Sequence, residues 1–251
     1  MHSCSRVAAL VRHNLTMTAR EPGPMLSRIV MPIVIVLVLR PLYSSALGNR
    51  ADGTTQAVVG MLVMFSLLGM SVVGNAVLAE RSWHTFDRLR ATPAHPAELL
   101  IGKAVPAWLL VLAQQVVVLC LGVGLLGLPV ASYGLLALAV IGWATTLLCF
   151  GFALATMVRS HAALSAATDI GSMICTCLGG ALVPLTQMPR WAQTIAPASP
   201  GYWAMRGLRG ALAGETSTAT SSVAVLCVAA LGAAGIAGVR VARGWGRTRL
   251  L

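Results

Sequence analysis

Long apolar runs alternate with short polar segments along this 251-residue chain. A transmembrane helix needs about 20 consecutive apolar residues to cross the ~30 Å hydrocarbon core of a bilayer. Glycine and proline inside such runs are tolerated in membrane helices. The pattern therefore predicts an all-α integral membrane protein. Its six predicted spans are Ile29–Leu47, Ala57–Ala79, Val105–Leu128, Tyr133–Val158, Ala163–Leu185 and Thr218–Val241.

The polar segments between these runs are short. Gly48–Thr55 contains Asp52-Gly53, a dipeptide typical of turns, and predicts an outer turn. No segment is long enough for a soluble domain, so we expect a single transmembrane domain over residues 1–251. Residues 1–24 mix basic and apolar positions and predict an interfacial elbow helix, which Pro22 and Pro24 end. A disordered tail is the alternative for this segment.

Composition and charge agree with a membrane protein. Hydrophobic residues make up 57% of the chain and charged residues 10%, whereas soluble domains carry about 25% charged residues. Most Lys and Arg residues fall where the spans would meet the cytoplasm, which predicts cytoplasmic N- and C-termini in a cell membrane. Because the net charge of +11 is scattered over the span edges, we expect contact with membrane lipid and no nucleic-acid partner.

Glu80–Lys103 is a polar segment between the second and third spans. It holds four of the eighteen Lys/Arg residues and three of the seven Asp/Glu residues. Trp83, Phe86 and Leu89 recur at a spacing that places them on one side of a helix. An aromatic anchor with a charged rim is typical of protein interfaces. We expect a short cytoplasmic helix that contacts a partner; a helix lying on the membrane surface is the alternative.

A second unusual segment, residues 184–217, precedes the last span. It is rich in proline, which ends helices, and in Tyr and Trp, which prefer the membrane interface. Non-helical backbone at membrane depth is tolerated where protein or water satisfies it. We therefore expect a re-entrant outer segment of short broken helices, with an amphipathic outer loop as the alternative. Its candidate residues are Pro184, Pro189, Trp191, Pro200, Tyr202 and Arg206.

These two segments resemble the permease subunits of ABC-2 type transporters, and the likeness covers essentially the whole chain. His84 departs from the family pattern, which has glycine before the threonine of the first motif. The first motif is matched by Glu80-Arg81, Thr85, Leu89, Thr92-Pro93 and Gly102-Lys103. The outer signature is matched by Gly180, Pro184, Pro189, Trp191, Pro200 and Tyr202, followed by Arg206 and Arg209.

The resemblance implies a bacterial drug or antibiotic exporter, like the daunorubicin-type permeases, with an elbow helix, six spans and a cytoplasmic coupling helix. It also implies a separate ABC ATP-binding subunit and a second permease subunit, identical or related. The expected cargo is hydrophobic or amphipathic; a lipid or glycan exporter is the alternative, and a membrane enzyme a distant one. The coupling surface would consist of Glu80, Arg81, Trp83, Thr85, Phe86, Leu89 and Pro93.

We expect no catalytic, cofactor or metal site in this chain. Gly102-Lys103 lacks the upstream glycine and the following hydroxyl residue of a phosphate-binding loop. ATP and Mg²⁺ would therefore be bound by the partner subunit. Cys175-Thr176-Cys177 lacks the paired spacing and the histidine partners of a zinc site.

A few polar residues lie within the predicted spans, where burial is expensive. Arg40 is expected to reach the outer interface or to pair with Asp169. We expect Asp169 to face the bundle interior, where it would pair with Arg40 or line the translocation pathway. Asn75 and the Gln114-Gln115 pair are expected to form hydrogen bonds between helices.

Overall fold

The computed structural model describes residues 11–12, 16, 22–82, 96–158 and 160–242. In these ranges the regular structure is entirely helical, as predicted. The α-helices are α2 (Pro22–Leu47), α3 (Arg50–Ser82), α5 (Pro96–Leu126), α6 (Tyr133–Met157), α7 (His161–Leu178), α8 (Arg190–Ile195), α9 (Pro200–Ala213) and α10 (Thr216–Ala242). Two 3₁₀ helices, η1 (Leu185–Gln187) and η2 (Ala196–Ala198), lie between α7 and α9.

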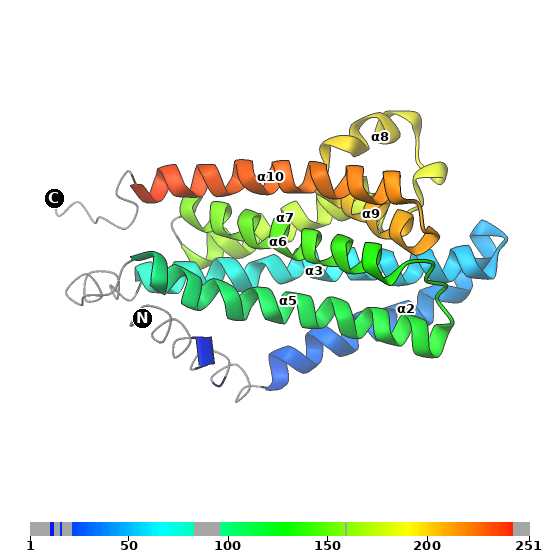
Figure 1. The fold of residues 1–251 in the computed structure, drawn as a ribbon, viewed down its shortest axis with the longest axis horizontal. Coiled ribbons are helices and arrows are strands. Elements are labelled where there is room, and N and C mark those ends of the chain that lie inside the picture. The colour runs from blue at the N-terminus through cyan, green and yellow to red at the C-terminus, as the bar shows by residue number, and fades with distance from the viewer. Residues whose placement is uncertain (1–10, 13–15, 17–21, 83–95, 159, 243–251) are drawn as a thin grey trace.

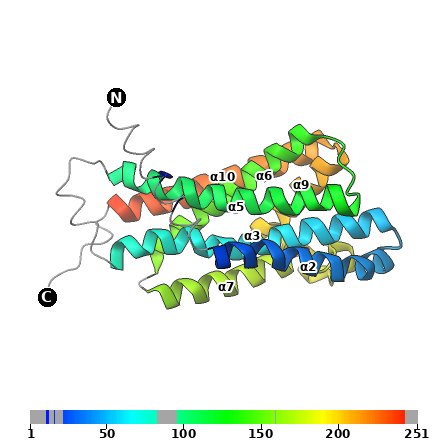
Figure 2. The ribbon, with the colours of Figure 1, turned by 90° about the horizontal axis from the view of Figure 1, so that it is seen from below.

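Helices α2, α3, α5, α6, α7 and α10 lie side by side in a bundle, with α3 in the middle (Figures 1 and 2). Helix α3 packs against α2, α5, α6, α7 and α9. Its apolar stretch is 72% buried, whereas that of α2 at the margin is 17% buried. The α2–α3 and α5–α6 connections lie at one end of the bundle, which we call the turn end (Figure 1). The turn end corresponds to the predicted outer side.

Within the residues that the structure describes, five helices are long and apolar enough to cross a membrane. The fifth predicted span corresponds to α7, which does not meet this criterion, because its 18 residues include Asp169 and four hydroxyl side chains. Five of the six predicted spans are therefore confirmed as candidate membrane spans. That α7 also crosses the membrane stays a prediction. The five candidate spans are Ser27–Leu47, Arg50–Asn75, Ala104–Leu126, Tyr133–Met157 and Thr216–Val241.

Two predicted boundaries are wrong. The turn expected over Gly48–Thr55 is much shorter, because α3 begins at Arg50 and contains Asp52-Gly53. Gly48, with a φ of 66°, reverses the chain, and the side-chain oxygen of Asn49 accepts from the amide of Ala51 at 2.9 Å. The span expected to reach Leu185 ends seven residues earlier, at Leu178.

The N-terminal elbow lies almost wholly outside the described residues. Arg12 and Thr16 are helical, and the Thr16 hydroxyl donates to the carbonyl of Arg12 at 2.8 Å. The expectation that Pro22 and Pro24 end this helix is tested only in part: α2 begins at Pro22 and includes Pro24. Proline is compatible with the first turn of a helix, where its missing N–H has no intrahelical partner.

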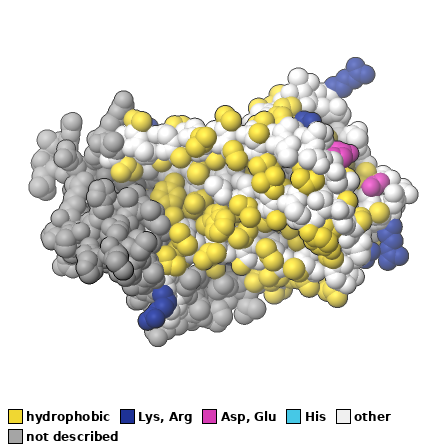
Figure 3. All heavy atoms as spheres, in the orientation of Figure 1, with side chains coloured by type: hydrophobic (Ala, Val, Ile, Leu, Met, Phe, Trp, Pro, Cys, Tyr) yellow, Lys and Arg dark blue, Asp and Glu magenta, His cyan; other side chains and the backbone are white. Residues whose placement is uncertain are grey.

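Many apolar side chains are exposed on the outside of the bundle. On the face shown in Figure 3, apolar side chains cover the middle, and the Lys, Arg, Asp and Glu side chains lie toward the two ends. Val38, Leu231 and Val228 are each more than two-thirds exposed. So much exposed apolar surface is expected where lipid surrounds the protein.

Candidate functional site

The predicted outer segment is a break between α7 and α10, and short helices fill it. After Leu178 the amide of Gly179 bonds the carbonyl of Cys175 at 2.8 Å. Gly180 then adopts a φ of 79°, a left-handed conformation that favours glycine. The chain passes through η1, α8 and η2 before α9 begins. Residues 184–217 thus hold short helices as predicted, and their insertion into a membrane stays a prediction.

The signature prolines of this segment stand where helices restart. Pro184 precedes η1, Pro189 precedes α8, and Pro200 is the first residue of α9. At these positions proline removes no intrahelical hydrogen bond. The Ser199 hydroxyl caps α9 by accepting from the amide of Gly201 at 3.2 Å. The prolines therefore determine where each short helix begins.

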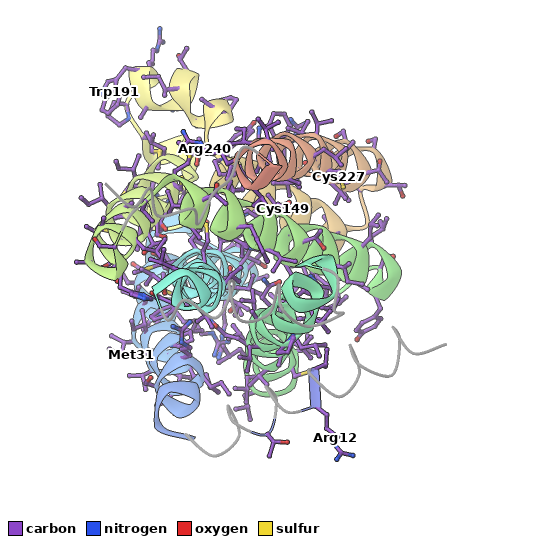
Figure 4. All side chains as sticks on the ribbon, turned by 90° about the vertical axis from the view of Figure 1, so that its left-hand side faces the viewer. Arg12, Met31, Cys149, Trp191, Cys227 and Arg240 are labelled. Carbon is purple, nitrogen blue, oxygen red and sulfur yellow. The ribbon has the colours of Figure 1, made fainter. Side chains whose placement is uncertain are left out.

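Aromatic and basic side chains of α9 form one contact cluster. The rings of Tyr202 and Trp203 meet edge to face at 5.2 Å. The guanidinium of Arg206 lies 5.5 Å from the Trp203 ring centroid, and the Trp203 indole donates to the carbonyl of Pro197 at 2.8 Å. Trp191 is separate from this cluster: it is 64% exposed on α8 and projects away from the bundle (Figure 4).

Side chains of α2 and α3 satisfy the backbone where α7 ends. The Gln56 amide donates to the carbonyls of Gly180 and Ala181 at 2.9 and 3.0 Å. The Tyr43 hydroxyl donates to the carbonyl of Leu182 at 2.6 Å. Gln56 lies six residues into α3, or about 9 Å at the helical rise. The break therefore lies within the bundle, and interior polar groups compensate for its non-helical backbone.

Arg40 of α2 bonds neighbouring helices at the turn end. Its Nε donates to the Thr54 hydroxyl at 3.0 Å, and its Nη2 donates to the carbonyl of Leu126 at 3.1 Å. Leu126 is the last residue of α5, so the guanidinium satisfies a carbonyl that lacks an intrahelical partner. The alternative pairing of Arg40 with Asp169 is wrong, because Arg40 uses these partners and Asp169 lies exposed on α7.

Asn75 and Gln114 face helix interfaces. The Asn75 side-chain oxygen lies 2.8 Å from Nδ1 of His161, which joins α3 to the first residue of α7. A Cβ placed on Gly69 of α3 would lie 3.7 Å from Oε1 of Gln114, so Gln114 points at α3. Gln115 is 1% exposed, and neither polar atom of its side-chain amide has a hydrogen-bond partner among the described residues, so the expected bond between helices is wrong for Gln115 within this part of the chain. A role of Asn75 and Gln114 in the translocation pathway stays a prediction.

Asp169 does not face the interior of this bundle, so that expectation is wrong for the single chain. Helix α7 buries Leu164, Thr168, Ser172 and Thr176, which recur every four residues on one face. Asp169 follows a buried residue and is rotated about 100° around the helix, and its side chain is exposed. Any part of Asp169 in translocation therefore requires a surface outside this bundle.

The coupling residues Trp83, Thr85, Phe86, Leu89 and Pro93 lie outside the described residues. Glu80 and Arg81 belong to the last turn of α3. That turn and the start of α5 lie at the same end of the bundle, opposite the turn end (Figure 1). The predicted coupling segment is thus joined directly to the central helix of the bundle.

Several structural contacts were not predicted from the sequence. Gln56 immediately precedes the predicted second span, so nothing marked it as buried. The indole of Trp143 donates to the hydroxyl of Ser66 at 2.8 Å, and both side chains are fully buried. A lone serine in an apolar run could have indicated such a bond, but its partner could not be inferred because it lies 77 residues away.

Comparisons with known proteins identify the family of this chain. Residues 5–213 match the ABC-2 type transporter family. A curated relative, the "Probable multidrug ABC transporter permease YbhR" of Escherichia coli K12, is 26% identical over 166 residues, which cover 65% of this chain and 44% of the relative. The protein of the same name from E. coli O157:H7 matches to the same extent. The chain spans less than half the length of these relatives. Because the family match covers most of its length, this chain belongs to the ABC-2 type transporter family and is a non-catalytic, multi-pass membrane permease subunit.

Proposed function

We propose that this chain is the permease of a bacterial ABC exporter that moves hydrophobic or amphipathic drug-like molecules out of the cell. The family implies an ATP-binding subunit as partner. In this proposal ATP and Mg²⁺ are bound there, and a second permease subunit, identical or related, completes the pathway. The word "multidrug" in the name of the relative YbhR supports a drug-like cargo.

The exposed carboxylate of Asp169 is the observation that carries the proposal. Asp169 is the ninth of the 18 residues of α7, about 12 Å from the helix start. Its neighbours Ile170 and Met173 are 63% and 52% exposed. A carboxylate in hydrocarbon is costly and is found facing protein or a water-filled path. A second permease packed beside α7 would enclose Asp169 in a shared pathway.

The chemistry of this α7 face favours a cationic amphipathic cargo. Exposed apolar side chains next to Asp169 offer contacts for rings and alkyl groups. A single carboxylate among them would attract a positively charged group and orient it. Neutral cargo would gain less from this charge.

The test removes the negative charge of Asp169 and keeps the size of its side chain. In cells that express the complete transporter, Asp169→Asn should reduce export of a cationic amphipathic dye about tenfold, the factor expected for losing one charge-assisted contact. Export of a neutral dye should change less, and Asp169→Glu should restore part of the cationic export. Ser165→Ala, which changes an exposed uncharged position one turn earlier, is the matched control.

Equal export of both dyes by wild type and Asp169→Asn would contradict the role of this carboxylate. Drug susceptibility after deletion of the gene tests the cargo class. Unchanged susceptibility together with altered membrane lipids or surface glycans would contradict drug export.

A further inference from the structure

A hollow of about 420 Å³ opens at the turn end of the bundle. It is bounded by the α2–α3 connection, the α5–α6 connection, η1 with Pro184, and the end of α9. Its size falls in the range of small-molecule sites, which enclose about 300–1,000 Å³. Segments far apart in the sequence thus form one concave site, and no residue of the proposed Asp169 pathway lines it.

A cationic side chain in this hollow has an unused hydrogen-bond donor. Arg209 projects from α9, and its Nε is buried without a hydrogen-bond partner among the described residues. Burial lowers the pKa of the Arg209 guanidinium, and the negative charge of Asp52 partly offsets that effect. Arginine nevertheless stays charged at physiological pH. The Nε itself is shut off from solvent, but the Arg209 side chain lines the hollow, and a charged guanidinium is a fork-shaped donor that matches the geometry of an oxyanion.

An anionic side chain lines the same hollow. Asp52 lies in the first turn of α3, is exposed, and lines the hollow. Leu47, Leu185 and Leu212 supply apolar walls around the two charges. A ligand with only an anionic group would satisfy Arg209 and be repelled by Asp52. A ligand with both charges would be attracted by both side chains.

We propose that this hollow binds a zwitterionic group, such as a phosphate joined to an ammonium by a short linker. The anionic oxygens bond the guanidinium of Arg209, and the cation lies against the carboxylate of Asp52. Such a group occurs in phospholipid headgroups and in zwitterionic small molecules. The proposal goes beyond drug export, because it does not depend on which cargo passes Asp169.

The test measures binding of a soluble headgroup to the purified full-length protein in detergent. Titration with glycerophosphoethanolamine should raise the melting temperature of the wild type in a saturable way. Arg209→Gln and Asp52→Asn should each weaken binding about tenfold or more, as expected for losing one charge-assisted contact. Matched controls are Arg206→Gln, an exposed arginine one turn earlier on α9, and Glu215→Gln, an exposed carboxylate between α9 and α10. Both controls should bind as the wild type does.

Binding of inorganic phosphate distinguishes a site for zwitterions from a site for any anion. Phosphate should bind the wild type more weakly than glycerophosphoethanolamine, and Asp52→Asn should strengthen phosphate binding. If phosphate binds as tightly as the zwitterion, or if the controls lose binding as the two variants do, the proposal is overturned.

Unchanged elution and melting temperature without ligand show that a variant is folded. If Arg209→Gln does not fold, binding to Asp52→Asn and the comparison with phosphate test whether the hollow binds a zwitterion.

Native mass spectrometry distinguishes the source of the ligand. Protein extracted from bilayers that contain phosphatidylethanolamine should retain this lipid in the wild type and lose it in Arg209→Gln if the ligand is a headgroup. Equal lipid retention in both proteins, with loss of soluble binding in the variant, assigns the site to a free zwitterion. Both results support the proposal, whereas equal retention together with equal soluble binding contradicts it.

Discussion

At the residue scale, a few buried polar side chains connect helices that are far apart in the sequence. Trp143 of α6 donates to Ser66 of α3 at 2.8 Å, and the Ser66 hydroxyl in turn donates to the carbonyl of Leu62 at 2.6 Å. Ser66 therefore satisfies a fully buried indole while its own proton is used within α3. In a low-dielectric interior, an indole N–H without an acceptor would be costly.

Ser66→Ala should destabilise the bundle. The substitution leaves the Trp143 N–H without its acceptor, which costs about 1–3 kcal/mol for a buried donor. Ser71→Ala is the matched control, because among the described residues the Ser71 hydroxyl bonds the carbonyl of Leu68 in its own helix and no side chain of another helix. Thermal unfolding in detergent should show a lower melting temperature for Ser66→Ala than for Ser71→Ala. Equal melting temperatures would mean that the indole contact contributes nothing measurable.

At the element scale, glycines allow α3, α7 and α9 to approach closely near the break. A Cβ on Gly60 would lie 2.2 Å from the carbonyl oxygen of Ala181, and a Cβ on Gly201 would lie 2.5 Å from that of Cys175. Both clashes involve backbone atoms, which cannot move aside as a flexible side chain can. Close helix contacts through small residues are typical of membrane bundles.

Gly60→Ala should therefore disrupt the packing of α3 against the break. We expect a loss of about 1–3 kcal/mol, the usual cost of overpacking a tight interior. Gly124→Ala is the control, because a Cβ at Gly124 would have no neighbour within 4 Å. The melting temperature and the yield of monodisperse protein measure the effect. A Gly60→Ala protein as stable as Gly124→Ala would contradict the close approach.

Hydropathy predicted the long helices well, because a membrane helix is defined mainly by its own apolar length. It failed where a tertiary contact determines the structure. The end of α7 at Leu178 depends on Gly180, whose carbonyl is bonded by Gln56, 124 residues away. The Asp169 side chain is exposed because a different face of α7 packs against α3. Neither contact can be inferred from periodicity in one sequence.

At the scale of the whole molecule, one helix connects the two ends that the proposals concern. Helix α3 begins beside the hollow that Asp52 lines, packs through the centre of the bundle, and ends at Ser82. The segment predicted to contact the ATP-binding subunit follows directly. A displacement of that segment would therefore act on the central helix, against which four other long helices pack.

The central claim, that an ATP-binding subunit drives this permease through residues 80–103, is tested most directly by cargo-stimulated ATP hydrolysis. The permease is reconstituted with its ATP-binding subunit in liposomes, as wild type, Trp83→Ala or Phe86→Asp. Trp191→Ala, which removes an exposed tryptophan on α8, is the control. Our account predicts that both coupling variants insert normally but lose the stimulation, because the apolar contact with the ATP-binding subunit is removed, while the control retains it. Full stimulation in both coupling variants would contradict the account.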